Sequence, residues 1–288
     1  MRSLRVLVVL GLVVTGLAGA TSYPLTVKDA LGRSVVLPHA PRRVIALLPS
    51  HTETVFALGA GKLLVGRDAF SDYPPAVKDV PVMGDLYNPS LEQILAAKPD
   101  LVLNSRYGNL TPALEKAGVT VWAGGADTLE GVYDTISTIG VLLDREAPAN
   151  RLVAAMRAQV RALALAAKAV KPVSVYYEID PTPYSVGPNS YLGSLLNLAG
   201  GRTIIPASLG DFPKVNPELV VAADPQVIIG ASRENIAARS GWSDIAAVKA
   251  GRVYSLTPQE DSLVSRAGPR LPQALRVLLR LLHPELPR

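Results

Sequence analysis

The hydrophobic and polar positions in the first half of the chain alternate between short apolar runs and stretches with helical spacing. Residues 43–48 form an apolar run that predicts a buried strand, and residues 52–59 follow with the spacing of a short helix that ends at a glycine. Residues 89–98 begin with a capping serine and helix-forming residues, and the apolar run 101–103 follows after a proline. Similar patterns continue to residue 143. Helices followed by buried strands predict an α/β layer.

The centre of the chain predicts one long helix. Residues 147–170 are almost entirely alanine, leucine, arginine, lysine, valine, glutamine and methionine, and no glycine or proline follows Pro148 in this stretch. Lys171 and Pro172 end the helical pattern. The apolar run 173–179 then predicts the first strand of a second α/β unit.

The second half of the chain repeats a pattern from the first half. Residues 216–229 correspond to residues 88–103, because an Asn-Pro pair opens each helix and Glu92 and Glu218 each lie seven residues before a proline. A repeat of this length predicts two similar lobes. The alternative is that two unrelated helix-to-strand units share common capping residues and prolines.

The N-terminus has the pattern of an export signal. Arg2 and Arg5 precede the apolar run 6–14, and the small residues 18–20 follow. This order is typical of a secretory signal peptide, and the apolar run is shorter than the roughly 20 residues that span a bilayer. We expect cleavage after Ala20 and an exported, soluble mature chain.

The composition narrows the class of protein. The 288 residues are 49% apolar and 18% charged, which excludes intrinsic disorder for most of the chain. The chain has no cysteine, so we expect no disulfide, no thiolate metal site and no lipid anchor on an N-terminal cysteine. The formal net charge is +5, two of these charges lie in the signal segment, and the remaining basic residues are scattered, so we expect no nucleic-acid partner.

The sequence lacks the motifs of common catalytic and metal sites. Residues 59–62 only partly match a phosphate loop, because Leu63 stands where serine or threonine is required. The adjacent Ser50 and His51 do not form a catalytic pair by themselves, and we interpret His51 as a cap or cleft residue. The three histidines have no paired spacing for a metal. We expect no catalytic residue, no metal and no cofactor, and an exported hydrolase is the alternative from another class.

Three segments carry a resemblance to a known family. They are the apolar run with its Pro-Ser-x-Thr-Glu motif at 43–53, the loop 65–75 and the helix-to-strand unit 88–103. Through them the chain resembles the periplasmic cobalamin-binding proteins of ABC importers, within a wider family that also binds iron-siderophores and haem. The similarity is strongest over residues 42–104 and continues more weakly to residues 266–270.

The resemblance implies a class III periplasmic binding protein, with two Rossmann-like α/β lobes whose central sheets are mainly parallel and which are joined by one long α-helix. The implied divisions are a signal peptide, an N-terminal lobe, a linker helix and a C-terminal lobe, at residues 1–20, 21–146, 147–171 and 172–288. The ligand is expected between the lobes, because clefts between domains commonly bind small molecules. The mature protein is expected to be a monomer in the periplasm.

The resemblance also implies a docking role for Glu92 and Glu218. In the family, one glutamate at each position lies on top of its lobe and contacts arginines of the permease dimer in the inner membrane. Two like carboxylates on two like lobes match a two-fold partner. The alternative is that both are ordinary first-turn glutamates, which stabilise a helix through its macrodipole.

The resemblance places Phe70, Tyr184 and Phe212 at positions where the family carries aromatic residues in its ligand cleft, and Tyr87 and Tyr107 are nearby candidates. A corrin ring is a broad apolar plane with amide-bearing edges, so aromatic faces can pack on it while polar side chains bind its rim. Two tryptophan positions of the family appear here as Leu86 and Ser105. The expected ligand contacts are Phe70, Leu86, Tyr87, Arg106, Tyr107, Tyr184, Phe212 and Arg266.

Two other ligands of the family stay open beside cobalamin, which is the favoured prediction. Haem requires an axial ligand such as a tyrosinate or a histidine, for which Tyr87, Tyr107 and His51 are candidates. A catecholate siderophore requires several cationic side chains to neutralise its charge. The candidate cations are Arg67, Arg106 and Arg266.

Overall fold

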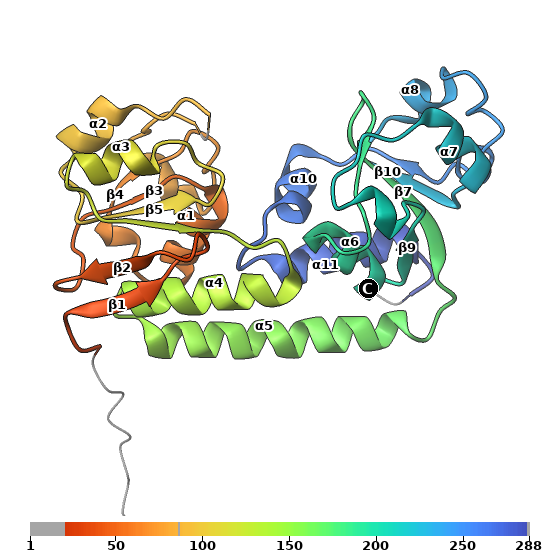
Figure 1. Cartoon of the computed structure of the whole chain (residues 1–288). Helices are drawn as coiled ribbons and strands as arrows, with labels where there is room; N and C mark the ends of the chain where they lie inside the picture. The colour runs from red at the N-terminus through yellow and green to blue at the C-terminus, as the bar shows by residue number, and fades with distance from the viewer. Residues whose placement is uncertain (1–20, 86, 287–288) are drawn as a thin grey trace, which may run out of the picture.

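The computed structural model describes residues 21–85 and 87–286. The expected signal peptide and Leu86 therefore lie outside the described residues. Two α/β lobes lie side by side above one long helix (Figure 1). Within the described ranges, no helix combines the length and the apolar character that crossing a membrane requires.

The N-terminal lobe is built on a four-stranded parallel sheet with the order β4-β3-β5-β6. Strands β3 and β5 are buried along their whole length, as expected for parallel strands with helices on both faces. Ile45 and Val102 point into the outer core of the lobe, whereas Val44 and Leu101 point into the core beneath the sheet. The elements of this lobe are β1 (Leu25–Lys28), β2 (Ser34–Leu37), β3 (Val44–Ala46), α1 (Pro49–Ala57), η1 (Gly61–Leu63), β4 (Leu64–Arg67), η2 (Pro75–Asp79), α2 (Leu91–Ala96), β5 (Leu101–Ser105), α3 (Thr111–Lys116), β6 (Val121–Gly124) and α4 (Leu129–Leu142).

The C-terminal lobe repeats this construction around β7. Strands β9, β10 and β11 extend the sheet in parallel, and β8 pairs with β7 in the antiparallel direction. Tyr176 and Ile228 face the outer core of this lobe, and Val175 and Val227 face the core beneath the sheet. The elements are β7 (Val173–Asp180), β8 (Tyr184–Ser185), α6 (Tyr191–Leu198), β9 (Gly201–Thr203), η3 (Ala207–Leu209), α7 (Pro217–Ala223), β10 (Val227–Ile229), α8 (Arg233–Ala237), α9 (Ala246–Lys249), β11 (Val253–Tyr254), α10 (Pro258–Ser265) and α11 (Leu271–Leu282).

The long helix α5 (Glu146–Ala167) joins the two lobes. It ends three residues before the predicted end at residue 170, because residues that precede a proline avoid the helical conformation and Pro172 follows closely. Helix α5 packs against α4 at one end and against α11 at the other (Figure 1). One continuous hydrophobic core contains residues of both lobes and of α5. The lobes therefore share a common base.

The backbone confirms the repeat that the sequence predicts. Helices α2 and α7 begin at capping side chains, those of Ser90 and Asn216. Each helix is then followed by a non-glycine residue at positive φ directly before the proline, at 45° for Lys98 and 42° for Asp224. A left-handed residue of this type is uncommon, so its presence at both positions argues against two unrelated units.

Candidate functional site

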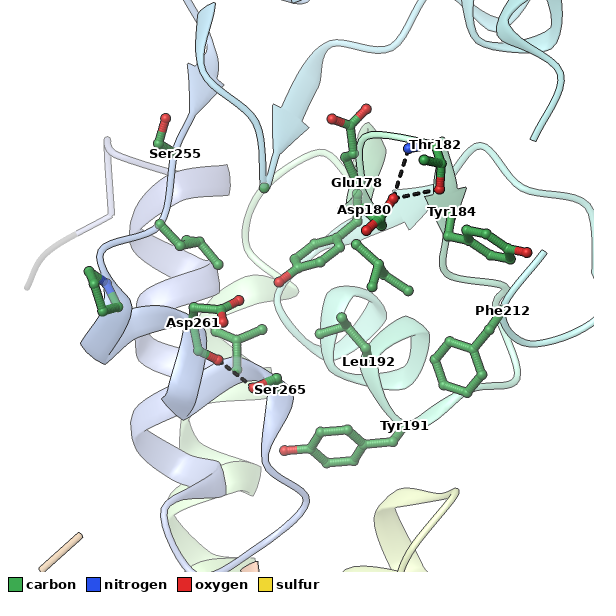
Figure 2. A pocket seen from close by; sticks show the side chains of 16 residues that line it. Glu178, Asp180, Thr182, Tyr184, Tyr191, Leu192, Phe212, Ser255, Asp261 and Ser265 are labelled. Carbon is green, nitrogen blue, oxygen red and sulfur yellow. Dashed lines mark hydrogen bonds between the residues drawn. The ribbon is translucent and has the colours of Figure 1, made fainter. Parts of the chain in front are cut away.

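A cavity of about 890 Å³ opens at the carboxyl end of the C-terminal sheet. Its walls come from the end of β7, from β8, from the start of α6 and from α10 (Figure 2). Tyr184 and Phe212, which the sequence analysis places in the ligand site, both line this cavity. The carboxyl ends of parallel strands are where open α/β sheets bind ligands, because the connections there leave a crevice.

Further exposed aromatic side chains follow the strands of the N-terminal lobe. Phe70 comes after β4 and Tyr107 comes after β5, again at carboxyl ends. The exposed fractions are 57% for Phe70, 75% for Tyr87, 73% for Tyr107, 41% for Tyr184 and 56% for Phe212. Large aromatic groups at such exposure are available for a ligand, since aromatic side chains of this size are otherwise mostly buried.

One hydrogen bond and one electrostatic interaction connect candidate ligand residues of the N-terminal lobe with the C-terminal lobe. Arg266, on the segment after α10, donates a 2.9 Å hydrogen bond to the main-chain carbonyl of Phe70. Partial burial raises the pKa of the Tyr107 phenol, the hydrogen bond and charge of Asp127 raise it further, and the charge of Asp211 in the other lobe adds to this. Phe70 and Tyr107 therefore lie on the side of the N-terminal lobe that faces the C-terminal lobe.

The three candidate cations are engaged inside the protein. Arg67 donates hydrogen bonds to the main-chain carbonyl groups of its own loop, at 3.0 to 3.2 Å. Arg106 pairs with Asp127 at 2.5 Å and lies over the ring of Tyr107. Arg266 binds carboxylates of the N-terminal lobe, as described below. None of these guanidinium groups is left without an internal partner to neutralise an anionic ligand.

A buried charge cluster connects the lobes. The Glu53 carboxylate on α1 accepts hydrogen bonds from Arg266 at 3.0 Å and from Arg270 at 2.8 and 2.5 Å. Arg266 also donates to Asp72 at 2.6 Å. Only 3% of the Glu53 side chain is exposed. Arg266, which the sequence analysis assigns to ligand binding, thus lies in this cluster and is not among the residues that line the cavity.

A second polar group fixes the loop that carries Phe70. The buried Asp68 carboxylate accepts the Phe70 amide at 2.9 Å and the hydroxyl of Ser71, which in turn contacts the Thr52 hydroxyl at 2.9 Å. Burial raises the pKa of Asp68, while these hydrogen bonds and the charge of Arg266 oppose the rise. The loop is therefore positioned before a ligand binds.

Glu92 and Glu218 lie in the first turns of α2 and α7, and both are exposed. Neither carboxylate forms an ion pair with another residue of 21–85 or 87–286. In Figure 1, α2 and α7 lie on the tops of their lobes, on the side opposite α5. This arrangement leaves both carboxylates accessible to a partner that spans the two lobes.

His51 differs from its predicted role as a cap or cleft residue. It is fully buried on α1, and neither of its ring nitrogens has a hydrogen-bond partner among the described residues. Its ring lies 5.5 Å from that of Trp122, which is buried in the core beneath the sheets, whereas Trp242 is buried in the outer core of the C-terminal lobe. Its burial excludes His51 as a ligand to anything in the cleft.

Several residues of the cavity wall were not predicted from the sequence, among them Tyr177, Asp180 and Asp261. Tyr177 lies in the second half of strand β7 and Asp180 is its last residue. The signal that could have found them is their place toward the carboxyl end of a predicted buried strand. Asp261 is on α10, far away in sequence, and no local pattern marks it. Within the described part of the chain, no cluster of histidine, aspartate and glutamate could hold a metal ion.

A family profile described as periplasmic binding protein matches residues 44–260. The chain belongs to this family. It is 31% identical over 277 residues to an uncharacterised ABC transporter substrate-binding lipoprotein of Bacillus subtilis, with 91% of this chain and 87% of the relative covered. It is also 31% identical over 242 residues to a vitamin B12-binding protein of Pectobacterium atrosepticum, with 80% and 85% covered.

Among solved structures, the periplasmic haem-binding protein of Roseiflexus sp. RS-1 in its apo form matches with a TM-score of 0.74 at 27% identity, covering 84% of this chain and 98% of that one. Two α/β lobes joined by a long helix are the class III arrangement, as the resemblance implied. This binding protein is the substrate-binding component of an ABC transporter in the family that includes binders of cobalamin, siderophores and haem. The expectation that it is not an enzyme is confirmed.

Proposed function

We propose that this binding protein captures cobalamin or a related corrinoid between its lobes and delivers it to the permease dimer of an ABC importer. In this proposal the chain is exported, is cleaved after Ala20 and acts as a monomer in the periplasm. The expected lobe boundaries at residues 146–147 and 171–172 belong to the same proposal.

The observation that carries the choice of ligand is the combination of exposed aromatic groups with arginines that already have partners. Phe70, Tyr184 and Phe212 offer apolar faces of the kind that pack on a corrin plane. A catecholate siderophore, in contrast, needs cations that are free to meet its charge, and Arg67, Arg106 and Arg266 are engaged. The charge pattern favours a ligand without a large negative charge.

Haem fits this pattern less well. Its iron requires an axial ligand, and the Tyr107 hydroxyl is already engaged, because it donates a 3.0 Å hydrogen bond to Asp127. His51 is buried and unavailable to a ligand. The similarity to a vitamin B12-binding protein over 80% of this chain also supports a corrinoid as the ligand.

The docking proposal rests on Glu92 and Glu218. Both carboxylates are exposed and occupy matching positions in the two halves of the repeat, and their helices α2 and α7 lie on the tops of the lobes (Figure 1). A two-fold permease can offer the same arginine-bearing surface to each lobe, so a matched pair of carboxylates would define the orientation of the complex.

The test of the ligand is retention of a coloured compound. The purified chain is mixed in turn with cyanocobalamin, haemin and a ferric catecholate siderophore, passed through a desalting column and examined by absorption spectroscopy. We expect corrin absorption bands to remain with the protein at a ratio near one to one. Retention of haemin or siderophore but not of cyanocobalamin would refute the proposed ligand.

A further inference from the structure

Tyr177 has an unusual position in the cavity wall. It lies near the carboxyl end of β7, lines the cavity and is only 3% exposed. Its hydroxyl forms no hydrogen bond with any residue that the structure describes, although the hydroxyls of Tyr176 and Tyr191 nearby do. A nearly buried hydroxyl needs a partner, so one at a cavity wall is suited to bind a group of the ligand.

Asp261 lines the same cavity as Tyr177. Burial raises the pKa of Tyr177, and the negative charge of Asp261 raises it further, so the phenol stays protonated and able to donate. The Asp261 carboxylate itself has neither an ion pair nor a hydrogen bond within the described chain. The Ser265 hydroxyl donates instead to the main-chain carbonyl of Asp261, at 2.7 Å (Figure 2). The wall thus presents one donor and one unengaged acceptor within the same cavity.

The other charges of the wall are also negative. The Glu178 carboxylate is neutralised by Arg239, which binds it at 2.5 and 2.8 Å. Asp180 is held by the amide and hydroxyl of Thr182, and these hydrogen bonds lower its pKa, so it stays charged (Figure 2). No lysine, arginine or histidine is among the described residues that line the cavity. An anionic group placed here would meet uncompensated negative charge.

We infer that this cavity holds a primary carboxamide of the ligand, with the Tyr177 hydroxyl donating to the amide oxygen and the Asp261 carboxylate accepting from the amide nitrogen. A primary amide is the neutral group that offers both an acceptor and two N–H donors, so it matches the pair of wall groups. The inference rests on the proposed function, because carboxamide side chains border the corrin ring. Tyr184 and Phe212, on the opposite side of the cavity in Figure 2, would then pack against the apolar part of the same ligand.

The test compares variants of the two wall residues by calorimetric titration with cyanocobalamin. Because a hydrogen bond to a charged group is stronger than a neutral one, we expect Asp261→Asn to weaken binding about tenfold and Tyr177→Phe to weaken it about fivefold. Asp134→Asn removes a charge from an exposed position on α4 and is the matched control, with affinity unchanged. Thermal melting checks that each variant is folded, and the exposed Asp261 decides the question if Tyr177→Phe does not fold.

A second probe tests the exclusion of anions. Mild acid hydrolysis converts single propionamides of cyanocobalamin into carboxylic acids, and the separated monoacids can be titrated in the same way. We expect the wild-type protein to bind at least one monoacid about tenfold more weakly than cyanocobalamin, and Asp261→Asn to reduce this difference. Equal affinity of the wild type for the amide and for every monoacid would overturn this exclusion.

The outcomes separate the inference from the proposed function. If cyanocobalamin binds to the wild type and binds equally well to Asp261→Asn and Tyr177→Phe, the carboxamide site is refuted and the corrinoid proposal stands. If the folded wild type does not bind cyanocobalamin at all, the proposed function fails, and the inference fails with it.

Discussion

Replacing Glu53 with glutamine tests how far the buried charge cluster between the lobes stabilises the protein. The Glu53 side chain is 3% exposed, and its partners Arg266 and Arg270 are 13% and 16% exposed. Glutamine keeps the size of the side chain but removes its charge, so two largely buried guanidinium groups lose the carboxylate that they share. The substitution acts on the contact between lobes and leaves the hydrophobic core unchanged.

The expected loss follows from the geometry. Removing one partner of a buried ion pair costs about 3–5 kcal/mol, chiefly because the remaining charge stays buried without compensation. Arg266 keeps Asp72 and the carbonyl of Phe70 as partners, at 2.6 and 2.9 Å. We therefore expect Glu53→Gln to lower the free energy of unfolding by the lower value, about 3 kcal/mol. Denaturant unfolding at pH 7 measures this as a lower midpoint at an unchanged slope.

Glu130 provides a matched control for Glu53. Its carboxylate also binds an arginine through two hydrogen bonds, to Arg157 at 3.0 and 2.6 Å. These side chains are 63% and 45% exposed, so solvent screens the pair and Glu130→Gln should cost at most about 1 kcal/mol. The reasoning is refuted if Glu53→Gln destabilises the protein no more than Glu130→Gln does.

Four further predictions follow from the same geometry. Phe70→Ala and Phe212→Ala should each weaken cyanocobalamin binding by about 1–3 kcal/mol in calorimetry, whereas Leu165→Ala, at an exposed site on α5, should leave the affinity unchanged. Unchanged affinity in both phenylalanine variants would place the ligand elsewhere. Changing Glu92 and Glu218 to lysine should leave ligand affinity unchanged but reduce ligand uptake in vesicles with the cognate permease, most strongly in the double variant. Normal uptake by the double variant would refute the docking role and leave both residues as ordinary first-turn helix glutamates. Burial lowers the pKa of His51 from 6.5 to about 4, so its contribution to the free energy of unfolding is complete above pH 6.5 and is lost as the pH falls toward 4, by about 3 kcal/mol in total. His51→Leu should flatten this part of the curve of unfolding free energy against pH, and an unaltered curve would contradict the prediction. Because the chain has no cysteine, one cysteine introduced on α2 and one on α7 can be spin-labelled selectively. The distance between the two labels should change by no more than a few ångströms when ligand binds, and a larger change would show that the shared core does not hold the lobes in place.

The fold was predictable from sequence because its signals are local. The apolar run before Pro49 predicts β3, and the composition of residues 147–170 predicts α5 to within one residue at its start and three at its end. The repeat was predictable for a similar reason, because Glu92 and Glu218 keep the same spacing to a proline in both halves. Periodicity and punctuation of this kind depend on neighbouring residues alone.

The candidate site was predictable only in part, because its contacts are distant in sequence. Arg266 lies 213 residues from Glu53, and no pattern near either residue indicates that they pair. The same holds for Tyr177 and Asp261, which meet at the cavity only after the C-terminal sheet and α10 have packed. The interpretation of His51 as a cap or cleft residue is wrong, because α1 places this side chain in the core.

The shared base and the charge cluster together limit how this binding protein can recognise a ligand. The continuous core beneath both sheets and the buried Glu53 with its two arginines connect the lobes at separate places, so a wide opening would expose apolar surface and unpair buried charges. In the proposed ligand site, recognition would depend on groups that are in place before the ligand arrives: the loop of Phe70 held by Asp68, and the wall of Tyr177 and Asp261. Groups that are already ordered lose little conformational entropy on binding, so such a cleft can discriminate between ligands by charge and hydrogen bonding without a large closure.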